Sequence, residues 1–401
     1  MKPYVKNKPK LLSQATKQDS LSYFPPNKTQ ILSKRSTYEI LEALEEKLIS
    51  AVKRRLVSDV PVGIFLSGGI DSTVVAYCAS KVNANVKAYI ADFKEKSFGE
   101  AYKAQKVCQE LKIPYKIFSV EPAKEDLESL VKKISYYADE PLADSSSLPV
   151  YLLCREASKE VKVVLSGDGG DEFFCGYLTY NADEVLKRLP FFARKALFKL
   201  FPLFMSLIPY NEKKVGIKEL TERFIGRINL PPAAAHFAWN GTFLHQEKIK
   251  LLSSNYLPQQ LKDTYLKLAY FYCKDINSPT LDELMQADQK GYLVNDILQK
   301  VDRMSMAWGL EVRPLFLDRE LASFACSIPS PLHFKNFTRK YLLKEFLKWR
   351  CPWYQYLSEK KGFSIPIHQW CRTNLKSFFE RLFFKSDNLF NKKELKKLWD
   401  K

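Results

Sequence analysis

Short apolar runs alternate with helical patterns over the first half of the chain. Continuous apolar segments predict buried strands at residues 62–66, 86–93, 115–120 and 161–165. Between these strands, apolar residues recur at helical spacing over residues 100–111, 127–137 and 148–160. Strands that alternate with helices are typical of an α/β fold with a parallel, doubly wound sheet.

Helical patterns stand on both sides of this alternating region. Ser36 and Glu39 have the spacing of a capping box, and apolar residues follow at helical spacing as far as Val52. Beyond Tyr177 the pattern is helical, and we expect no further strand before Lys401. We therefore predict three parts: a polar, lysine-rich tail or linker at 1–35, an α/β core at 36–180, and a helical portion at 181–401 that completes the site.

The first predicted strand is followed by a glycine turn that favours phosphate binding. Residues 67–72 (SGGIDS) come directly after it and lead into a helix. A helix N-terminus offers unpaired N–H groups and partial positive charge, and paired glycines let the backbone approach an anion closely. A carboxylate beside a phosphate implies a cation between them, so Asp71 suggests Mg²⁺. The loop lacks the Gly-Lys-Ser/Thr ending of the Walker motif, and an ordinary Ser-Gly-Gly turn is the alternative.

A second glycine-rich segment, crowded with acids, follows the strand at 161–165. Residues 166–172 (SGDGGDE) hold three glycines and three acids, and carboxylates so close together repel one another unless a cation or a proton relieves them. If this strand neighbours the first, Asp71 and Asp171 could face one Mg²⁺ on a polyphosphate. The alternative is a solvated acidic loop.

Charged residues recur at near-helical spacing further along the chain. Asp296, Lys300 and Arg303 could share one face of a helix and serve a site. They could equally form ion pairs within the helix, and spacing alone does not separate the two interpretations.

Composition narrows the classes of partner and compartment. The net charge is +18, but the lysines are spread along the chain, so a nucleic-acid partner is not favoured. Eight cysteines without a CxxC pair, and an N-terminus without an apolar signal region, favour a reducing cytoplasmic location.

The apolar stretch at 191–210 is interrupted by Arg194, Lys195, Lys199 and Pro202. We therefore expect packed helices rather than a membrane span, with a membrane-surface helix as the alternative.

Three segments together closely resemble the synthetase domain of the asparagine synthetase B family: residues 67–72, 166–177 and 302–318. Further similarities lie at 58–63, at 139–141 with 144–146, and at Lys361, Gly362, Phe363, Pro366 and Trp370. The resemblance covers roughly residues 36–375. The first loop alone would also fit tRNA-modifying ATP pyrophosphatases, but the SGDGGDE segment distinguishes the two groups.

The resemblance implies a fold of the ATP pyrophosphatase (adenine nucleotide α hydrolase-like) type and an ATP-dependent amide-forming ligase. Aspartate would be adenylated to β-aspartyl-AMP with release of PPi, and ammonia would then displace AMP. Asp168 takes the position of an essential acid, Lys340 resembles the lysine of the adenylation step, and Asp71 and Asp171 would bind Mg²⁺. The residues that the resemblance places around ATP are Leu66, Ser67, Gly68, Gly69, Asp71, Ser72, Ala91, Ser166 and Gly167.

The sequence also departs from the family pattern. Glutamine-using members carry a catalytic cysteine after the initiator methionine and a glutaminase domain, whereas Lys2 follows Met1 here and the first cysteine is Cys78. We therefore expect a synthetase domain without the glutaminase domain, using free ammonia or ammonia from a separate glutaminase. The order Pro314-Leu315-Phe316 differs from the commoner x-Pro-Phe and leaves the acceptor acid open. A related synthetase acting on another carboxylic acid is the main alternative, and an interaction subunit without catalysis is a further one.

Overall fold

The computed structural model describes residues 35–83, 85–93, 101–120, 126–204, 217–257, 262–354, 367–385 and 389–400. The predicted tail before residue 35 and the similarity at Lys361–Pro366 lie outside the described residues.

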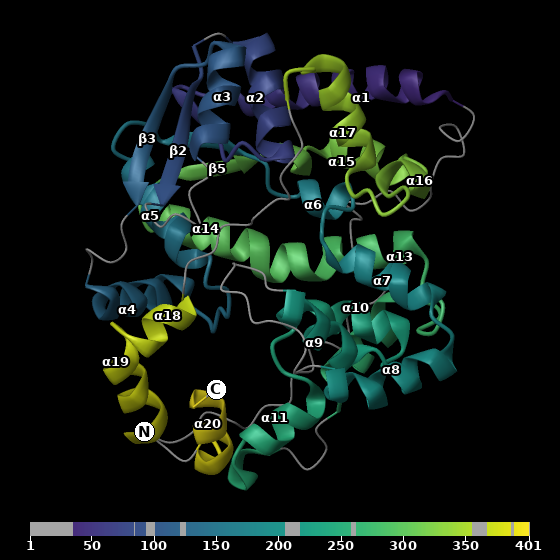
Figure 1. The fold of residues 1–401 in the computed structure, drawn as a ribbon. Helices are drawn as coiled ribbons and strands as arrows, with labels where there is room; N and C mark the ends of the chain where they lie inside the picture. The colour runs from purple at the N-terminus through teal and green to yellow at the C-terminus, as the bar shows by residue number, and fades with distance from the viewer. Residues whose placement is uncertain are drawn as a thin grey trace, which may run out of the picture.

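A five-stranded parallel sheet forms the centre of the upper part of the molecule (Figure 1). Its strand order is β3-β2-β1-β4-β5. In chain order the strands are β1 (Val62–Phe65), β2 (Lys87–Phe93), β3 (Tyr115–Val120), β4 (Val163–Ser166) and β5 (Glu311–Pro314). In this register Ile64 of β1 lies between Ala88 of β2 and Leu165 of β4. The neighbouring positions of β1 and β4, on which the predicted shared site depends, are thus confirmed.

The fifth strand corrects the expectation that no strand follows Tyr177. β5 lies at the edge of the sheet, parallel to β4, with Val164 opposite Val312. It is short, ends in Pro314, and buries none of its residues completely, so it carries neither an apolar run nor a clear alternation. Residues far beyond 180 therefore complete the sheet, and the exact boundary between core and helical portion stays a prediction.

Helices cover both faces of the sheet, which confirms the doubly wound α/β class. One face packs against α1 (Thr37–Arg55), α2 (Ile70–Val82), α3 (Ala101–Leu111), α15 (Arg319–Ser327) and α17 (Tyr341–Arg350) in a single hydrophobic core. The other face packs against α4 (Leu127–Ala138) and α5 (Ser147–Ala157). The predicted capping box is present at the start of α1, where Ser36 and Glu39 bond to each other's backbone N–H groups.

A helical portion lies below the sheet (Figure 1). The long path from α13 (Leu281–Ala287) through a π-helical segment (Asp288–Leu298) to α14 (Gln299–Met306) runs between the two parts. The other helices of this portion and of the connecting segments are α6 (Gly170–Phe173), α7 (Thr179–Arg188), α8 (Phe191–Phe204), α9 (Ile217–Arg227), α10 (Pro232–Asn240), α11 (His245–Leu251), α12 (Thr264–Tyr272), α16 (Ser330–His333), α18 (Ile367–Arg372), α19 (Lys376–Glu380) and α20 (Lys392–Trp399).

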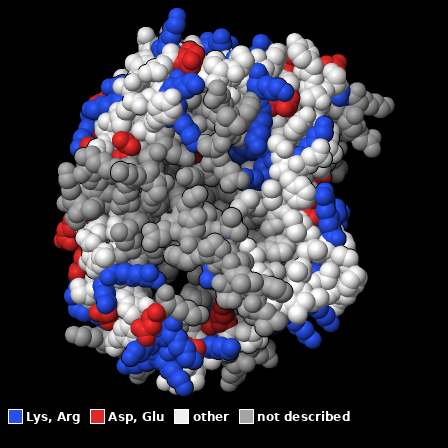
Figure 2. Space-filling view, viewed as in Figure 1, with Lys and Arg blue, Asp and Glu red and all other residues white. Residues whose placement is uncertain are grey.

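Within the described ranges, no helix is long and apolar enough to cross a membrane. Helix α8 does pack through Phe201 against a small hydrophobic cluster that includes Ile225 of α9. Figure 2 shows Lys and Arg side chains spread over this face of the molecule, with a dense group at the position of α20.

Candidate active site at the carboxyl ends of β1 and β4

The predicted phosphate loop joins β1 to the N-terminus of α2. Ser67 and Ser72 hold the loop closed, because their hydroxyl oxygens lie 3.0 Å apart and Ser72 Oγ also accepts from the Ser67 N–H at 3.3 Å. Gly69 is the N-cap of α2 and no side chain caps this end, so the first-turn N–H groups face the loop without a side-chain acceptor. The loop therefore has the backbone donors and the helix end that bind an anion.

Gly68 is required by the shape of this loop. Its φ is +75°, and a Cβ there would lie 2.7 Å from the backbone nitrogen of Ala104 on α3. The Gly68 carbonyl accepts a hydrogen bond from the Tyr354 hydroxyl at 2.9 Å. A side chain at this position would separate the loop from α3, so the glycine follows from the close approach as well as from the backbone angle.

The acidic loop that follows β4 lies directly against the start of α2. A Cβ on Gly167 would be 2.9 Å from Asp71 Cβ, and one on Gly170 would be 2.6 Å from Asp71 Oδ1. Ser166 Oγ donates to Asp168 Oδ2 at 2.7 Å, which orients that acid. The two loops predicted from separate parts of the sequence therefore lie against each other, as a shared site requires.

Lys340 lies between the two predicted metal ligands. Its Nζ is 2.6 Å from Asp171 Oδ1 and also forms an ion pair with Asp71. Its backbone is left-handed with φ 50° at the N-cap of α17, and its N–H donates to the Cys175 carbonyl at 3.3 Å. The residue is 3% exposed. A chain segment far from both loops thus supplies the cation that joins them.

Gly176 has no side chain, and this leaves space for the contact between Asp171 and Lys340. A Cβ there would overlap Asp171 Oδ1 and Lys340 Cε. Arg339 Nη1 donates to the Gly176 carbonyl at 2.8 Å and fixes the backbone from the other side. The side chains of Asp171 and Lys340 meet only because this position carries none.

The residues present fit a magnesium ion that also binds phosphate. Asp71 and Asp171 share one ammonium partner, so their carboxylates lie close together, and carboxylate oxygens are ligands that Mg²⁺ prefers. No group of three or more His, Cys, Asp or Glu side chains arranged around a metal position occurs in the described part of the chain. Mg²⁺ commonly binds through one or two carboxylates, substrate phosphates and waters, and this pair matches that pattern.

A buried acid behind the site was not singled out from the sequence. Glu172 is 1% exposed, and burial together with the neighbouring Asp171 raises its pKa to about 8. The Tyr177 hydroxyl donates to its carboxyl group, and Gln289 Nε2 donates to its backbone carbonyl at 3.1 Å. Glu172 therefore links the acidic loop to the helical portion. The only sequence signal for it was its place at the end of the SGDGGDE segment.

Two of the charged residues predicted to share a helix face form ion pairs with acids in the segment between α4 and α5. Lys300 Nζ lies 2.6 Å from Asp144 Oδ2, and Arg303 lies 3.6 Å from Asp139. Burial opposes the charge on Asp144, but Lys300 outweighs burial and its pKa is lowered. Burial and Asp144 raise the pKa of Asp296. Lys300 and Arg303 thus form their ion pairs with a segment outside the helix, and a role of these charges in the site stays a prediction.

Leu66 and Ala91 pack against hydrophobic clusters of the sheet. Leu66 is buried, and its N–H donates to the Tyr89 carbonyl at 3.1 Å. Ala91, on β2, packs against the hydrophobic clusters that include Trp308. With their side chains in the core, both residues would meet a nucleoside through the backbone, and this role stays a prediction.

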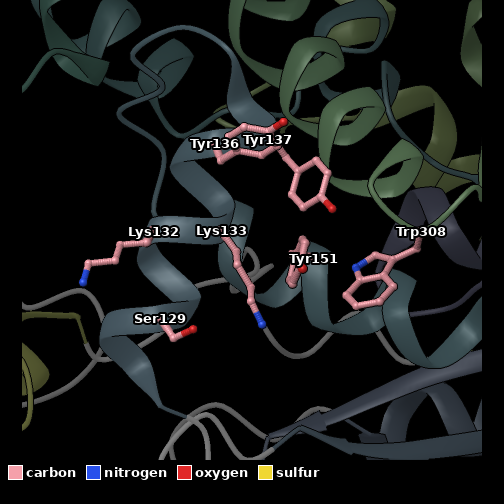
Figure 3. A pocket seen from close by; sticks show the side chains of 7 residues that line it. All are labelled: Ser129, Lys132, Lys133, Tyr136, Tyr137, Tyr151 and Trp308. Carbon is pink, nitrogen blue, oxygen red and sulfur yellow. The ribbon is translucent and has the colours of Figure 1, made fainter.

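A pocket of about 400 Å³ lies beside α4 (Figure 3). Aromatic and lysine side chains line it: Tyr136, Tyr137, Tyr151, Trp308, Lys132 and Lys133. The rings of Tyr151 and Trp308 have centroids 5.0 Å apart. None of the sequence-predicted site residues lines this pocket, so it is separate from the Asp71–Lys340–Asp171 cluster.

Curated proteins with similar sequences are asparagine synthetases. The chain is 29% identical over 372 residues to asparagine synthetase [glutamine-hydrolyzing] 1 of Bacillus subtilis, a match that covers 91% of this chain and 55% of the relative. It is 30% identical over 338 residues to a putative asparagine synthetase [glutamine-hydrolyzing] of Mycobacterium bovis, covering 83% of this chain and 49% of the relative. The chain thus spans about half the length of these curated relatives.

Two further similarities are more distant, and no argument about the fold rests on them. The amidase chyE of Penicillium rubens is 25% identical over 376 residues, covering 84% of this chain and 54% of the relative. An NMN synthetase structure from Francisella tularensis matches 36% of this chain and 59% of its own, with 24% identity and a TM-score of 0.26.

The model of the asparagine synthase family matches residues 43–401. Because this match covers far more than half of the chain, the chain belongs to the asparagine synthase family.

Proposed function

We propose that this chain is an ATP-dependent, amide-forming ligase of the asparagine synthetase type. The side-chain carboxylate of aspartate attacks the α-phosphorus of ATP, which forms β-aspartyl-AMP and releases PPi. Ammonia then attacks the acyl carbon and displaces AMP. The observation that carries this proposal is Lys340, held between Asp71 and Asp171 at the carboxyl ends of β1 and β4.

The first step needs charge neutralisation because a carboxylate must approach a polyanion. The first-turn N–H groups of α2, with Ser67 and Ser72 beside them, would bind the departing pyrophosphate. Lys340 would release part of its contact with the two acids and neutralise charge that develops on the α-phosphate. When bound, Mg²⁺ would screen the phosphates and align them against Asp71 and Asp171.

The second step needs a group that accepts a proton from the attacking ammonia. Asp168 lies in the acidic loop, and its Oδ2 is already oriented by the Ser166 hydroxyl. We assign it the role of positioning the adenylate and receiving that proton. Leu66, Ala91 and Gly167 would contact the nucleoside through their backbone groups.

A different acceptor acid is the second candidate function. Two fungal relatives, 25% and 24% identical to this chain, are named amidases rather than asparagine synthetases. The Pro314-Leu315-Phe316 departure also lies behind the acidic loop, where Phe316 Cε2 would be 3.1 Å from a Cβ on Gly170. Repacking at this point can change the space available to the acceptor without altering the ATP loop.

Pyrophosphate release by the purified chain tests both candidates. The protein is supplied with Mg-ATP and either aspartate or a panel of other carboxylic acids, each with ammonium or with glutamine, and Asp71→Asn serves as the blank. Asparagine formed with ammonium supports the first candidate. Turnover with another acid but not with aspartate supports the second. If the protein is folded and binds ATP but releases no pyrophosphate with any of the acids tested, both candidate functions are overturned for the isolated chain.

A further inference from the structure

Helix α8 presents aromatic and basic side chains to solvent with no acid among them. Its most exposed apolar residues are Phe192 at 76%, Phe191 at 60%, Leu200 at 52%, Phe198 at 45% and Leu197 at 40%. The sequence FFARKALFKLFPLF contains Arg194, Lys195 and Lys199 and no Asp or Glu. Five exposed large apolar side chains within ten residues make this helix a candidate interaction surface.

Among the described residues, α8 is fixed at its start and along one side. Arg194 donates to the carbonyls of Leu186 and Leu189 at 2.7 and 2.9 Å, which ties the start of α8 to the end of α7. Phe201 packs against the hydrophobic cluster beneath it. Phe192, Lys195 and Lys199 are spaced so that they share the opposite, solvent-facing side. Lys195 Nζ lies 4.6 Å from the centre of the Phe191 ring, so charge and aromatic surface are adjacent.

We propose that α8 docks this protein on an anionic lipid surface. Helices that lie in the interfacial plane of a bilayer combine Phe or Leu, which enter the headgroup boundary, with Lys or Arg, which meet anionic headgroups. The buried cores of protein–protein interfaces are depleted in lysine, whereas here lysines stand between the exposed aromatic rings. The surface at the position of α8 in Figure 2 is neutral with Lys or Arg beside it.

Surface attachment also fits the length and charge of the protein. Among the described residues no helix could cross a membrane, so the proposed contact of α8 is with the bilayer surface. The net charge of +18 attracts the whole chain toward anionic lipid before α8 makes contact. The proposal is independent of the reaction, because the residues of α8 are not among those assigned to the active site.

Vesicle flotation of the full chain tests the proposal. Vesicles of phosphatidylcholine alone are compared with vesicles that contain about one third phosphatidylglycerol, at low and at high salt. We expect binding to the anionic vesicles only, and a decrease of roughly tenfold or more in Phe191→Ser/Phe192→Ser and in Lys195→Glu/Lys199→Glu. These side chains are exposed, so both variants keep the fold, which circular dichroism and pyrophosphate release check.

Two control variants on other helices test whether binding depends on α8 itself, rather than on the overall charge of the protein or on any exposed aromatic side chain. Phe271→Ser removes a phenylalanine that is 77% exposed on α12, and Lys392→Glu/Lys393→Glu makes the same charge change on α20. Both should retain vesicle binding within about twofold. Equal binding to both vesicle types, or equal losses in the α20 and α8 variants, would overturn the proposal. Concentration-dependent self-association that requires Phe191 and Phe192, without vesicle binding, would overturn it in favour of a second copy of the chain.

Discussion

Lys300 and Asp144 are 156 positions apart in the chain, and Lys300 Nζ lies 2.6 Å from Asp144 Oδ2. The other oxygen of Asp144 accepts from the Ser146 N–H at 2.8 Å, so one carboxylate joins α14 to the start of α5. The Lys300 side chain is 8% exposed and that of Asp144 is 22% exposed. This pair therefore fixes the segment that leads into α5 against α14, and its contribution to stability can be measured.

Lys300→Met should lower the free energy of unfolding by about 1–3 kcal/mol at neutral pH, because it leaves a mostly buried carboxylate without its cation. Lys300 lowers the pKa of Asp144, so the contribution is fully present above the unfolded value of about 3.9 and is lost progressively as pH falls from there through the lower folded value. Urea unfolding at pH 7 and near pH 3.5 measures the change. Arg303→Met breaks the exposed pair with Asp139 and should cost about 0.5 kcal/mol or less. A difference for Lys300→Met that does not shrink in acid would contradict this assignment.

Lys340→Met should abolish pyrophosphate release, with a decrease of at least about 100-fold in kcat, because the ammonium that would neutralise charge developing on the α-phosphate is lost. It should also reduce stability, since Asp71 and Asp171 would lose their shared ammonium partner. The exposed Lys348 on the same helix provides the control, and Lys348→Met should retain activity. Partial restoration by Lys340→Arg in the presence of Mg-ATP would indicate that charge, rather than the exact ammonium geometry, is required.

Gly176→Ala should reduce activity strongly, because the added methyl overlaps Asp171 Oδ1 and Lys340 Cε and must displace one of them. A second glycine offers a clean comparison. Gly226, within α9, has no atom within 4 Å of the place a Cβ would take, so Gly226→Ala should stabilise the helix by about 0.5–1 kcal/mol without changing turnover. Steady-state kinetics and thermal unfolding of the two variants measure both effects. Equal activity in the two variants would mean that the Asp171–Lys340 contact is not needed for the reaction.

His236 should act as a buried cation that joins three helical segments. Its Nδ1 lies 2.7 Å from Asp183 Oδ2 and its Nε2 3.2 Å from Asp288 Oδ1. Burial opposes protonation, but the two acids outweigh it and raise the pKa of His236. The stabilisation is therefore fully present below the unfolded value of about 6.5 and is lost as pH rises toward the higher folded value.

His236→Gln should lower the free energy of unfolding by about 3–5 kcal/mol near pH 6, because both acids would lose their shared cation. The difference from the unchanged protein should decrease as pH rises above about 6.5. Denaturant unfolding between pH 6 and 9 follows this trend, with His245→Gln as the matched change. A difference that grows with pH would show that His236 is neutral in the folded protein.

Local patterns in the sequence predicted most of the core. Apolar runs predicted β1 to β4, and Ser36 with Glu39 predicted the start of α1. The glycines and acids of the two loops predicted their chemistry, because those residue types at a strand end have few structural uses. Lys340, by contrast, came only from the family resemblance, since its local segment is short and lysines are common in this chain.

The sequence alone determined where the chain forms strands, helices and anion-binding turns, because those depend on neighbours a few residues apart. Only the tertiary structure decided that β1 and β4 are adjacent, that β5 completes the sheet, and that Lys340 joins Asp71 to Asp171. It also decided that Lys300 pairs with Asp144 rather than with an acid on its own helix. These contacts join residues more than a hundred positions apart, and their energies depend on packing and burial that no local pattern records.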